Sequence, residues 1–190
     1  MTHEWLGLLA GALELSSLPI YVYSIFCGKT KPSRVTWWVL AIVTGMITLS
    51  YYASGARETI WLPAAYTLSF AIVAILSLRY GDGPFTLSLM DRLSLVAAAG
   101  SGIVWFFAKS PVPALFMNIC TEFAGLVPTM YKAYYRPWTE SRLPWAIGTA
   151  AAFLNILAID EWSFVIAAYP LYIFASNAII TAFLFPQKKR

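Results

Sequence analysis

Two glutamates, Glu14 and Glu122, lie inside long apolar stretches of the chain. An ionised carboxylate at the centre of a bilayer costs about 2.5–3.5 kcal/mol on insertion scales. Such a group therefore faces a bundle interior, pairs with a neighbour, or stays protonated. It can bind a proton or face a cationic solute, and the plainer alternative is a neutral Glu that ties helices together by hydrogen bonds. Because Glu14 and Glu122 also occupy equivalent positions of the repeat described below, we favour the functional role.

Several uncharged polar side chains accompany the two acids. Asn118 precedes Glu122 by four residues, which places both on one helix face. Buried amides need partners, and for Asn155 interhelical hydrogen bonds are the preferred explanation. The residues expected to complete a polar and aromatic cavity are Tyr66, Ser69, Tyr169 and Tyr172, although tyrosines are also common packing residues.

The other reactive residue types do not form a catalytic pattern. His3 is the only histidine and lies in the N-terminal tail, while Cys27 and Cys120 lie in different apolar segments. This arrangement has neither metal-ligand spacing nor a nucleophile with a plausible base. We therefore expect no enzyme activity, no metal and no cofactor.

The elements that must position these residues are transmembrane helices. The chain of 190 residues is 59% hydrophobic and 12% charged, whereas a soluble domain has about 25% charged residues. A helix needs about 20 apolar residues to cross a bilayer. The apolar runs predict an all-α membrane protein with seven transmembrane helices, at about 5–26, 35–54, 60–79, 92–108, 112–134, 143–159 and 162–185.

The basic residues predict how these helices are oriented. With the N-terminus outside, the cytosolic segments hold 11 Lys and Arg residues and the outer segments hold two, Arg57 and Lys109. Lys and Arg are enriched in cytosolic loops. The bias predicts an N-out/C-in topology, and no basic stripe suggests nucleic acid as a partner.

The first half of the chain recurs weakly in the second half. At an offset of 108 residues, Glu14 aligns with Glu122 and Trp37 with Trp145, and Ser33-Arg34 aligns with Ser141-Arg142. Four helices separate the copies, so both repeats cross the membrane in the same direction. This predicts a 3+1+3 arrangement of two parallel triple-helix bundles, with a first bundle at 1–80, a linker helix at 81–110 and a second bundle at 111–190.

With its seven spans, parallel repeats and a proline in the first and fifth helices followed by a basic loop, the chain resembles the SWEET and PQ-loop (MtN3-like) superfamily of small membrane transporters. The resemblance implies a solute site between the two bundles, alternating access by rocking, and a substrate contact at Asn177. Pro19 and Pro128 are the expected hinge residues, against the alternative of static kinks. Trp37 and Trp145 are expected at the cavity mouth because they recur, although most tryptophans here are typical of an interfacial belt.

The resulting functional prediction is a transporter that moves a small polar solute, with coupling to protons through Glu14 and Glu122 left open. The solute class ranges over sugars, amines, amino acids and vitamin-like metabolites. The alternatives are a receptor of the same fold that binds a peptide or metabolite, and a structural subunit of a membrane complex. The expected location is a bacterial inner membrane. The expected partners are the lipid bilayer and the small-molecule solute, and the oligomeric state is left open.

Overall fold

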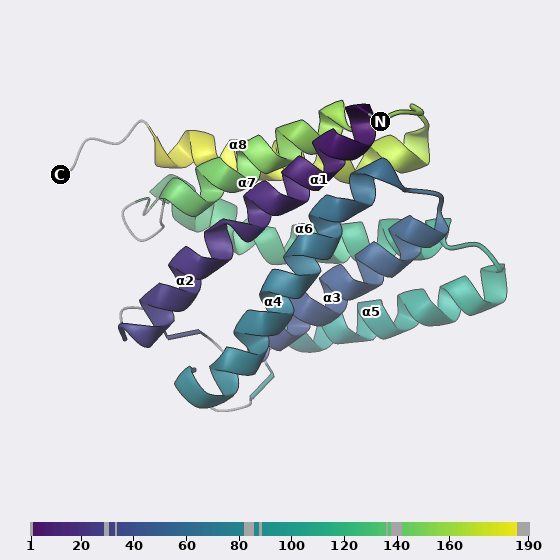
Figure 1. Ribbon diagram of the computed structural model, residues 1–190. Helices are drawn as coiled ribbons and strands as arrows, with labels where there is room; N and C mark the ends of the chain where they lie inside the picture. Colours follow the sequence, from purple (N-terminus) through teal and green to yellow (C-terminus); the bar gives the residue numbers. More distant parts are fainter. Residues whose placement is uncertain are drawn as a thin grey trace.

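The described residues of this chain are almost entirely helical. The computed structural model describes residues 2–28, 31–32, 34–81, 86–87, 89–135, 137 and 142–185, without the side chains of Met90, Pro128 and Lys132. Within these ranges the elements are α1 (Thr2–Leu15), α2 (Ser17–Phe26), α3 (Arg34–Ala53), the short 3-10 helix η1 (Glu58–Ile60), α4 (Trp61–Tyr80), α5 (Leu89–Ala108), α6 (Val112–Tyr135), α7 (Arg142–Leu157) and α8 (Phe164–Leu184). The helices lie alongside one another in a single bundle (Figure 1).

Among the described residues, six stretches of helix are long and apolar enough to cross a membrane, with α1 and α2 together forming the first. This confirms the prediction of an apolar, helical chain of the membrane type. The remaining predicted span corresponds to α7, which has only 16 residues. At about 1.5 Å per residue it covers about 24 Å, less than the roughly 30 Å of a bilayer core.

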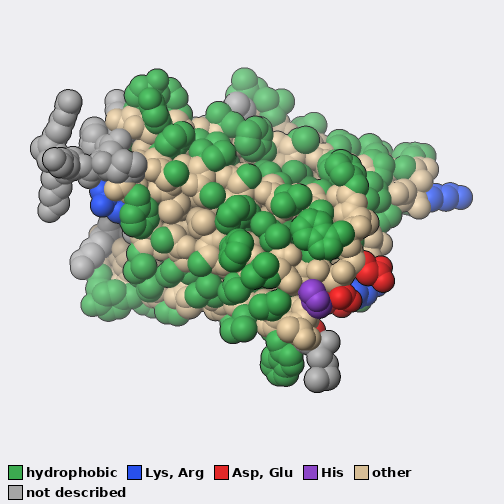
Figure 2. Space-filling view, turned by 90° about the horizontal axis from the view of Figure 1, so that it is seen from above, with side chains coloured by type: hydrophobic (Ala, Val, Ile, Leu, Met, Phe, Trp, Pro, Cys, Tyr) green, Lys and Arg blue, Asp and Glu red, His purple; other side chains and the backbone are tan. Residues whose placement is uncertain are grey.

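Large apolar side chains cover the outside of the bundle, as expected where acyl chains are the solvent. Examples on one helix are Val96, Ile103 and Phe106 of α5, which are 69%, 59% and 77% exposed. In Figure 2 a broad hydrophobic surface occupies the middle of the molecule, and the visible charged side chains gather toward its two ends. The predicted basic residues Lys29, Arg136 and 188–190 lie outside the described residues.

The first span is broken between α1 and α2. Pro19 has no N–H to donate to the carbonyl of Leu15, and the Ser16 hydroxyl donates to the Leu13 carbonyl at 2.6 Å. The break at Ser16 therefore lies next to Pro19, one of the two predicted hinge residues. Position 128 differs, because α6 runs through it without interruption.

The two halves of the chain use the same pattern of helix contacts. In the first half α4 packs against both α1 and α3, and in the second α8 packs against both α6 and α7. Across the halves, α1 contacts α7 and α3 contacts α6. A hydrogen bond between threonines joins α3 to α4 (Thr48–Thr67, 2.9 Å), and another joins α7 to α8 (Thr149–Thr181, 2.8 Å). Helix α5 stands apart from this pattern and packs on α6 and α3.

Helix α1 lies very close to the start of α4 because it carries glycines at the contact. A Cβ atom added to Gly11 would lie 2.8 Å from the carbonyl oxygen of Trp61, and one on Gly7 would meet the carbonyl of Glu58. We therefore expect Gly11→Ala to destabilise the protein by about 1–3 kcal/mol, the usual cost of overpacking. Thermal unfolding in detergent should show this as a lower melting temperature.

Gly45→Ala is the matched control, since its Cβ would meet only the Thr67 methyl at 3.8 Å. Alanine is favoured over glycine in a helix by about 0.5–1 kcal/mol, so this variant should melt at or above the wild-type temperature. Equal melting temperatures for the two variants would contradict the close packing of α1 on α4.

Candidate functional site

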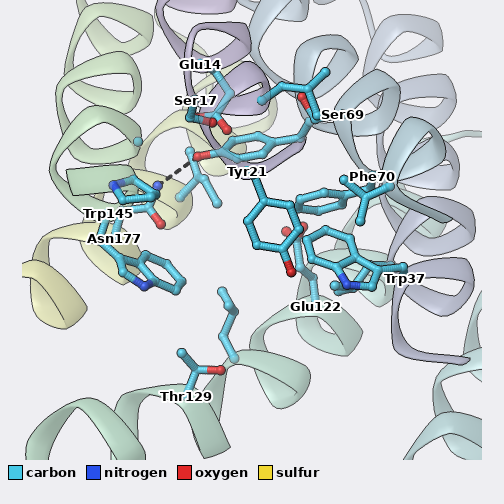
Figure 3. A pocket seen from close by; sticks show the side chains of 18 of the residues that line it. Glu14, Ser17, Tyr21, Trp37, Ser69, Phe70, Glu122, Thr129, Trp145 and Asn177 are labelled. Carbon is cyan, nitrogen blue, oxygen red and sulfur yellow. Dashed lines mark hydrogen bonds between the residues drawn. The ribbon is translucent and has the colours of Figure 1, made fainter. Parts of the chain in front are cut away.

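A cavity of about 430 Å³ lies between the two halves of the bundle. Ligand pockets span about 300–1,000 Å³, so this space is large enough for a small solute. Figure 3 shows the labelled side chains converging on it. Its walls come from α1, α2, α3, α4, α6, α7 and α8. The lining residues are Glu14, Ser17, Leu18, Tyr21, Thr36, Trp37, Leu40, Tyr66, Ser69, Phe70, Val73, Glu122, Gly125, Leu126, Thr129, Pro144, Trp145, Gly148, Ile173 and Asn177.

The lining follows the sequence repeat. Sixteen of the 20 lining residues form eight pairs that are 108 positions apart. The pairs are Glu14/Glu122, Ser17/Gly125, Leu18/Leu126, Tyr21/Thr129, Thr36/Pro144, Trp37/Trp145, Leu40/Gly148 and Ser69/Asn177. The cavity is thus built from matching positions of two similar halves, even where the residue types differ.

The cavity occupies one end of the bundle. On α3 it uses Thr36, Trp37 and Leu40, which lie in the first two turns, and Thr36 is exposed at the surface. Further along the same helix, Val43, Ile47 and Tyr51 are buried in the hydrophobic core. The cavity therefore reaches the surface near the start of α3, while packed side chains fill the helix's other end.

Both glutamates lie in the cavity wall and are nearly buried. Glu14 is 6% exposed and Glu122 is 7% exposed. One carboxyl oxygen of each, Oε2, has no hydrogen-bond partner, and the same is true of the Ser69 hydroxyl. Because unpaired buried polar atoms are costly, these atoms are available to a ligand or a proton.

A chain of polar groups runs from α8 to α1 across the cavity. The Asn177 amide donates to the Tyr66 hydroxyl at 3.0 Å, drawn dashed in Figure 3, and Tyr66 in turn is hydrogen-bonded to Glu14. Gly148 of α7 lets this chain of polar groups pack close to the α7 backbone. A Cβ atom there would lie 3.2 Å from the Tyr66 hydroxyl, 3.3 Å from Asn177 Nδ2 and 3.5 Å from Glu14 Oε2. We call these three atoms, packed against Gly148, the Gly148 cradle.

An aromatic row forms another part of the wall. The ring centroids of Tyr21 and Trp37 are 5.2 Å apart, those of Trp37 and Phe70 are 5.4 Å apart, and those of Phe70 and Tyr66 are 5.7 Å apart. In Figure 3, Tyr21, Trp37 and Phe70 lie together on one side of the view, and Trp145 and Asn177 lie on the other side. In the second half the counterpart of Tyr21 is the smaller Thr129, while the counterpart of Trp37 is Trp145.

The structure brings together seven of the nine residues that the sequence suggested for binding: Glu14, Tyr66, Ser69, Glu122, Trp37, Trp145 and Asn177. The other two do not line the cavity. Asn118 donates to the Ser101 hydroxyl and to the Ala114 carbonyl, both at 2.8 Å, and so joins α6 to α5. Tyr169 is fully buried and packs on Tyr51 with the ring centroids 5.6 Å apart. Pro19 is exposed, and the Pro128 side chain lies outside the described residues.

Sequence reasoning missed several lining residues, of which Ser17, Tyr21, Thr129 and Gly148 matter most. The offset of 108 contained the signal: Tyr21 pairs with Thr129, and Gly148 pairs with Leu40. Applying the repeat to every position near the glutamates, and not only to identical residues, would have found them.

Searches of protein-family models, of curated proteins and of solved structures each found no match for this chain. Its function therefore has to be argued from the cavity itself.

Proposed function

We propose that the protein is a membrane transporter that moves a small polar solute by alternating access between two three-helix bundles. In this proposal the architecture is SWEET-like, 3+1+3, with α5 as the linker helix and with the N-terminus outside and the C-terminus in the cytosol. The single observation that carries it is the cavity lined by eight residue pairs 108 positions apart. Sites between repeats, near the membrane midplane, are typical of transporters built from internal repeats.

Three further observations support movement of one half against the other. The same helix contacts occur in both halves. The repeat relates α1 to α6 and α3 to α7, so the contact of α1 with α7 corresponds to the contact of α6 with α3. The cavity reaches the surface where Thr36 is exposed, and core residues of α3 fill the bundle beyond it, which is the arrangement expected for one of two alternating states. The break beside Pro19 lies next to Ser17 and Leu18, which line the cavity. A change of angle there would reshape the site.

In the proposed cycle the solute enters from the end at which Thr36 is exposed. The unpaired atoms of Glu14, Glu122 and Ser69 hold the solute or a coupling proton. One three-helix bundle then rocks against the other, which closes this end of the cavity and opens the opposite end. The basic loops would place the open end on the cytosolic side of a bacterial inner membrane.

Two-sided access can be tested without knowing the solute. In a chain with Cys27 and Cys120 replaced by alanine, Ser69→Cys puts one thiol in the cavity wall. A membrane-impermeant methanethiosulfonate is applied to right-side-out and to inside-out vesicles. Alternating access predicts labelling from both sides, faster from the side on which Thr36 is exposed.

Ala152→Cys is the control, because Ala152 is fully buried in the core and should resist labelling from either side. Labelling of Ser69→Cys from one side only would overturn transport in favour of a receptor with a one-sided pocket. No labelling from either side would favour a structural subunit.

A further inference from the structure

Resting on the proposed function, the structure points to the class of solute: we propose that the cavity selects a small organic amine, bound as an ammonium cation with its apolar part against the aromatic row. The first argument is charge. Glu14 and Glu122 both line the cavity, and none of its 20 described lining residues is Lys, Arg or His. Two acids without a protein cation beside them in the wall favour a positively charged ligand and disfavour an anion.

The second argument is the supply of hydrogen-bond acceptors. An ammonium group carries three donors and no acceptor. The Gly148 cradle offers the unpaired Oε2 of Glu14, with the Tyr66 hydroxyl oxygen in the same group of atoms. Glu122 Oε2 and the Ser69 oxygen are two further unpaired acceptors in the same wall. A neutral sugar, whose hydroxyl groups each donate one hydrogen bond and can accept two, carries no charge to match two carboxyl groups.

The third argument is the aromatic row. Cations are attracted to the faces of Trp, Tyr and Phe within about 6 Å of the ring centroid. Trp37, Phe70 and Tyr21 line the same cavity as Glu14 and Glu122, so one end of a ligand can meet a carboxylate while its carbon skeleton lies on the rings. The pairing of rings and carboxylates distinguishes an amine from a small inorganic cation, which would be hydrated or coordinated by oxygens alone.

The test compares three ligands of one shape and different charge. Purified full-length protein in detergent is titrated by calorimetry with phenethylamine, with its neutral counterpart 2-phenylethanol, and with the anion phenylacetate. We expect phenethylamine to bind at least tenfold more tightly than 2-phenylethanol and phenylacetate to give no binding heat. Putrescine, tested in parallel, shows whether a second ammonium group adds affinity by using both glutamates.

The glutamates are then tested by neutral substitution. Glu14→Gln and Glu122→Gln should each weaken phenethylamine binding at least tenfold and reduce its preference over 2-phenylethanol. Glu161→Gln, the same change at an exposed residue outside the cavity, should leave binding unchanged. The ligand comparison on the wild-type protein stands even if a glutamate variant fails to fold.

Binding of 2-phenylethanol or D-glucose as tight as that of phenethylamine would overturn the amine proposal, and so would the absence of binding by both phenethylamine and putrescine. Either result would leave alternating access to be decided independently, by the labelling of Ser69→Cys from the two sides. Amine binding together with one-sided labelling would instead retain the amine site and reject transport.

Discussion

Gly148→Ala is expected to abolish most ligand binding while leaving the protein folded. The new methyl group would lie 3.2–3.5 Å from the Tyr66 hydroxyl, Asn177 Nδ2 and Glu14 Oε2, which together form the Gly148 cradle. These distances are tight but do not force backbone movement, and alanine is the better helix former. A hydrogen bond to a charged group contributes about 1.5–3 kcal/mol, so displacing Glu14 Oε2 from its place in the wall should weaken phenethylamine binding about 10- to 100-fold by calorimetry.

Gly125→Ala provides the matched control, because Gly125 is also a helical glycine in the cavity wall. An added Cβ there meets nothing within 4 Å. Binding to this variant should stay within about threefold of wild type, a difference of about 0.7 kcal/mol. Equal losses in Gly125→Ala and Gly148→Ala would show that only cavity volume matters and would contradict a role for the cradle.

Tyr51→Phe is expected to loosen the packed end of the bundle and shift the protein toward the state that is open on that side. The Tyr51 hydroxyl donates to the Ile166 carbonyl at 2.6 Å and lies 2.7 Å from Thr59 Oγ1. It therefore joins α3 to α8 and to η1, across the two halves. Removing it leaves buried groups without a partner, at a cost of about 1–3 kcal/mol.

The measurement combines thermal unfolding with thiol labelling. In the Ser69→Cys background, Tyr51→Phe should speed labelling from the packed side about tenfold, which corresponds to about 1.4 kcal/mol, and lower the melting temperature. Tyr52→Phe is the control, since the neighbouring Tyr52 is 53% exposed. If both variants label at the wild-type rate, the Tyr51 contact does not hold that end closed.

Much of the site could be predicted because the sequence repeats. Glu14 and Glu122 stand at the same position of two similar halves, so packing the halves together brings both acids to one cavity. A carboxylate is costly in lipid, so each glutamate can be assigned to the interior face of its helix without knowing which residues lie next to it. Trp37 and Trp145 follow from the same offset.

Other features depend on packing that the pattern does not contain. Asn118 and Glu122 are four residues apart, which turns one about 40° from the other around the helix. Since α6 is surrounded by α5, α3 and α8, this angle is enough to send Asn118 to Ser101 on α5 instead of to the cavity. The short length of α7 is also not predictable from the sequence, because apolar residues continue beyond Leu157, where the helix ends.

The Leu40/Gly148 pair breaks the symmetry of the cavity. One half carries an isobutyl group where the other half carries only hydrogen. Two duplicated halves with identical walls would accept a ligand in either of two orientations related by the pseudo-twofold axis. Here the two orientations meet different walls, because a side chain narrows the cavity at Leu40 and none does at Gly148. A molecule with unlike ends therefore has a preferred way to lie, and in the proposed cycle each turnover would present the same end to the exit.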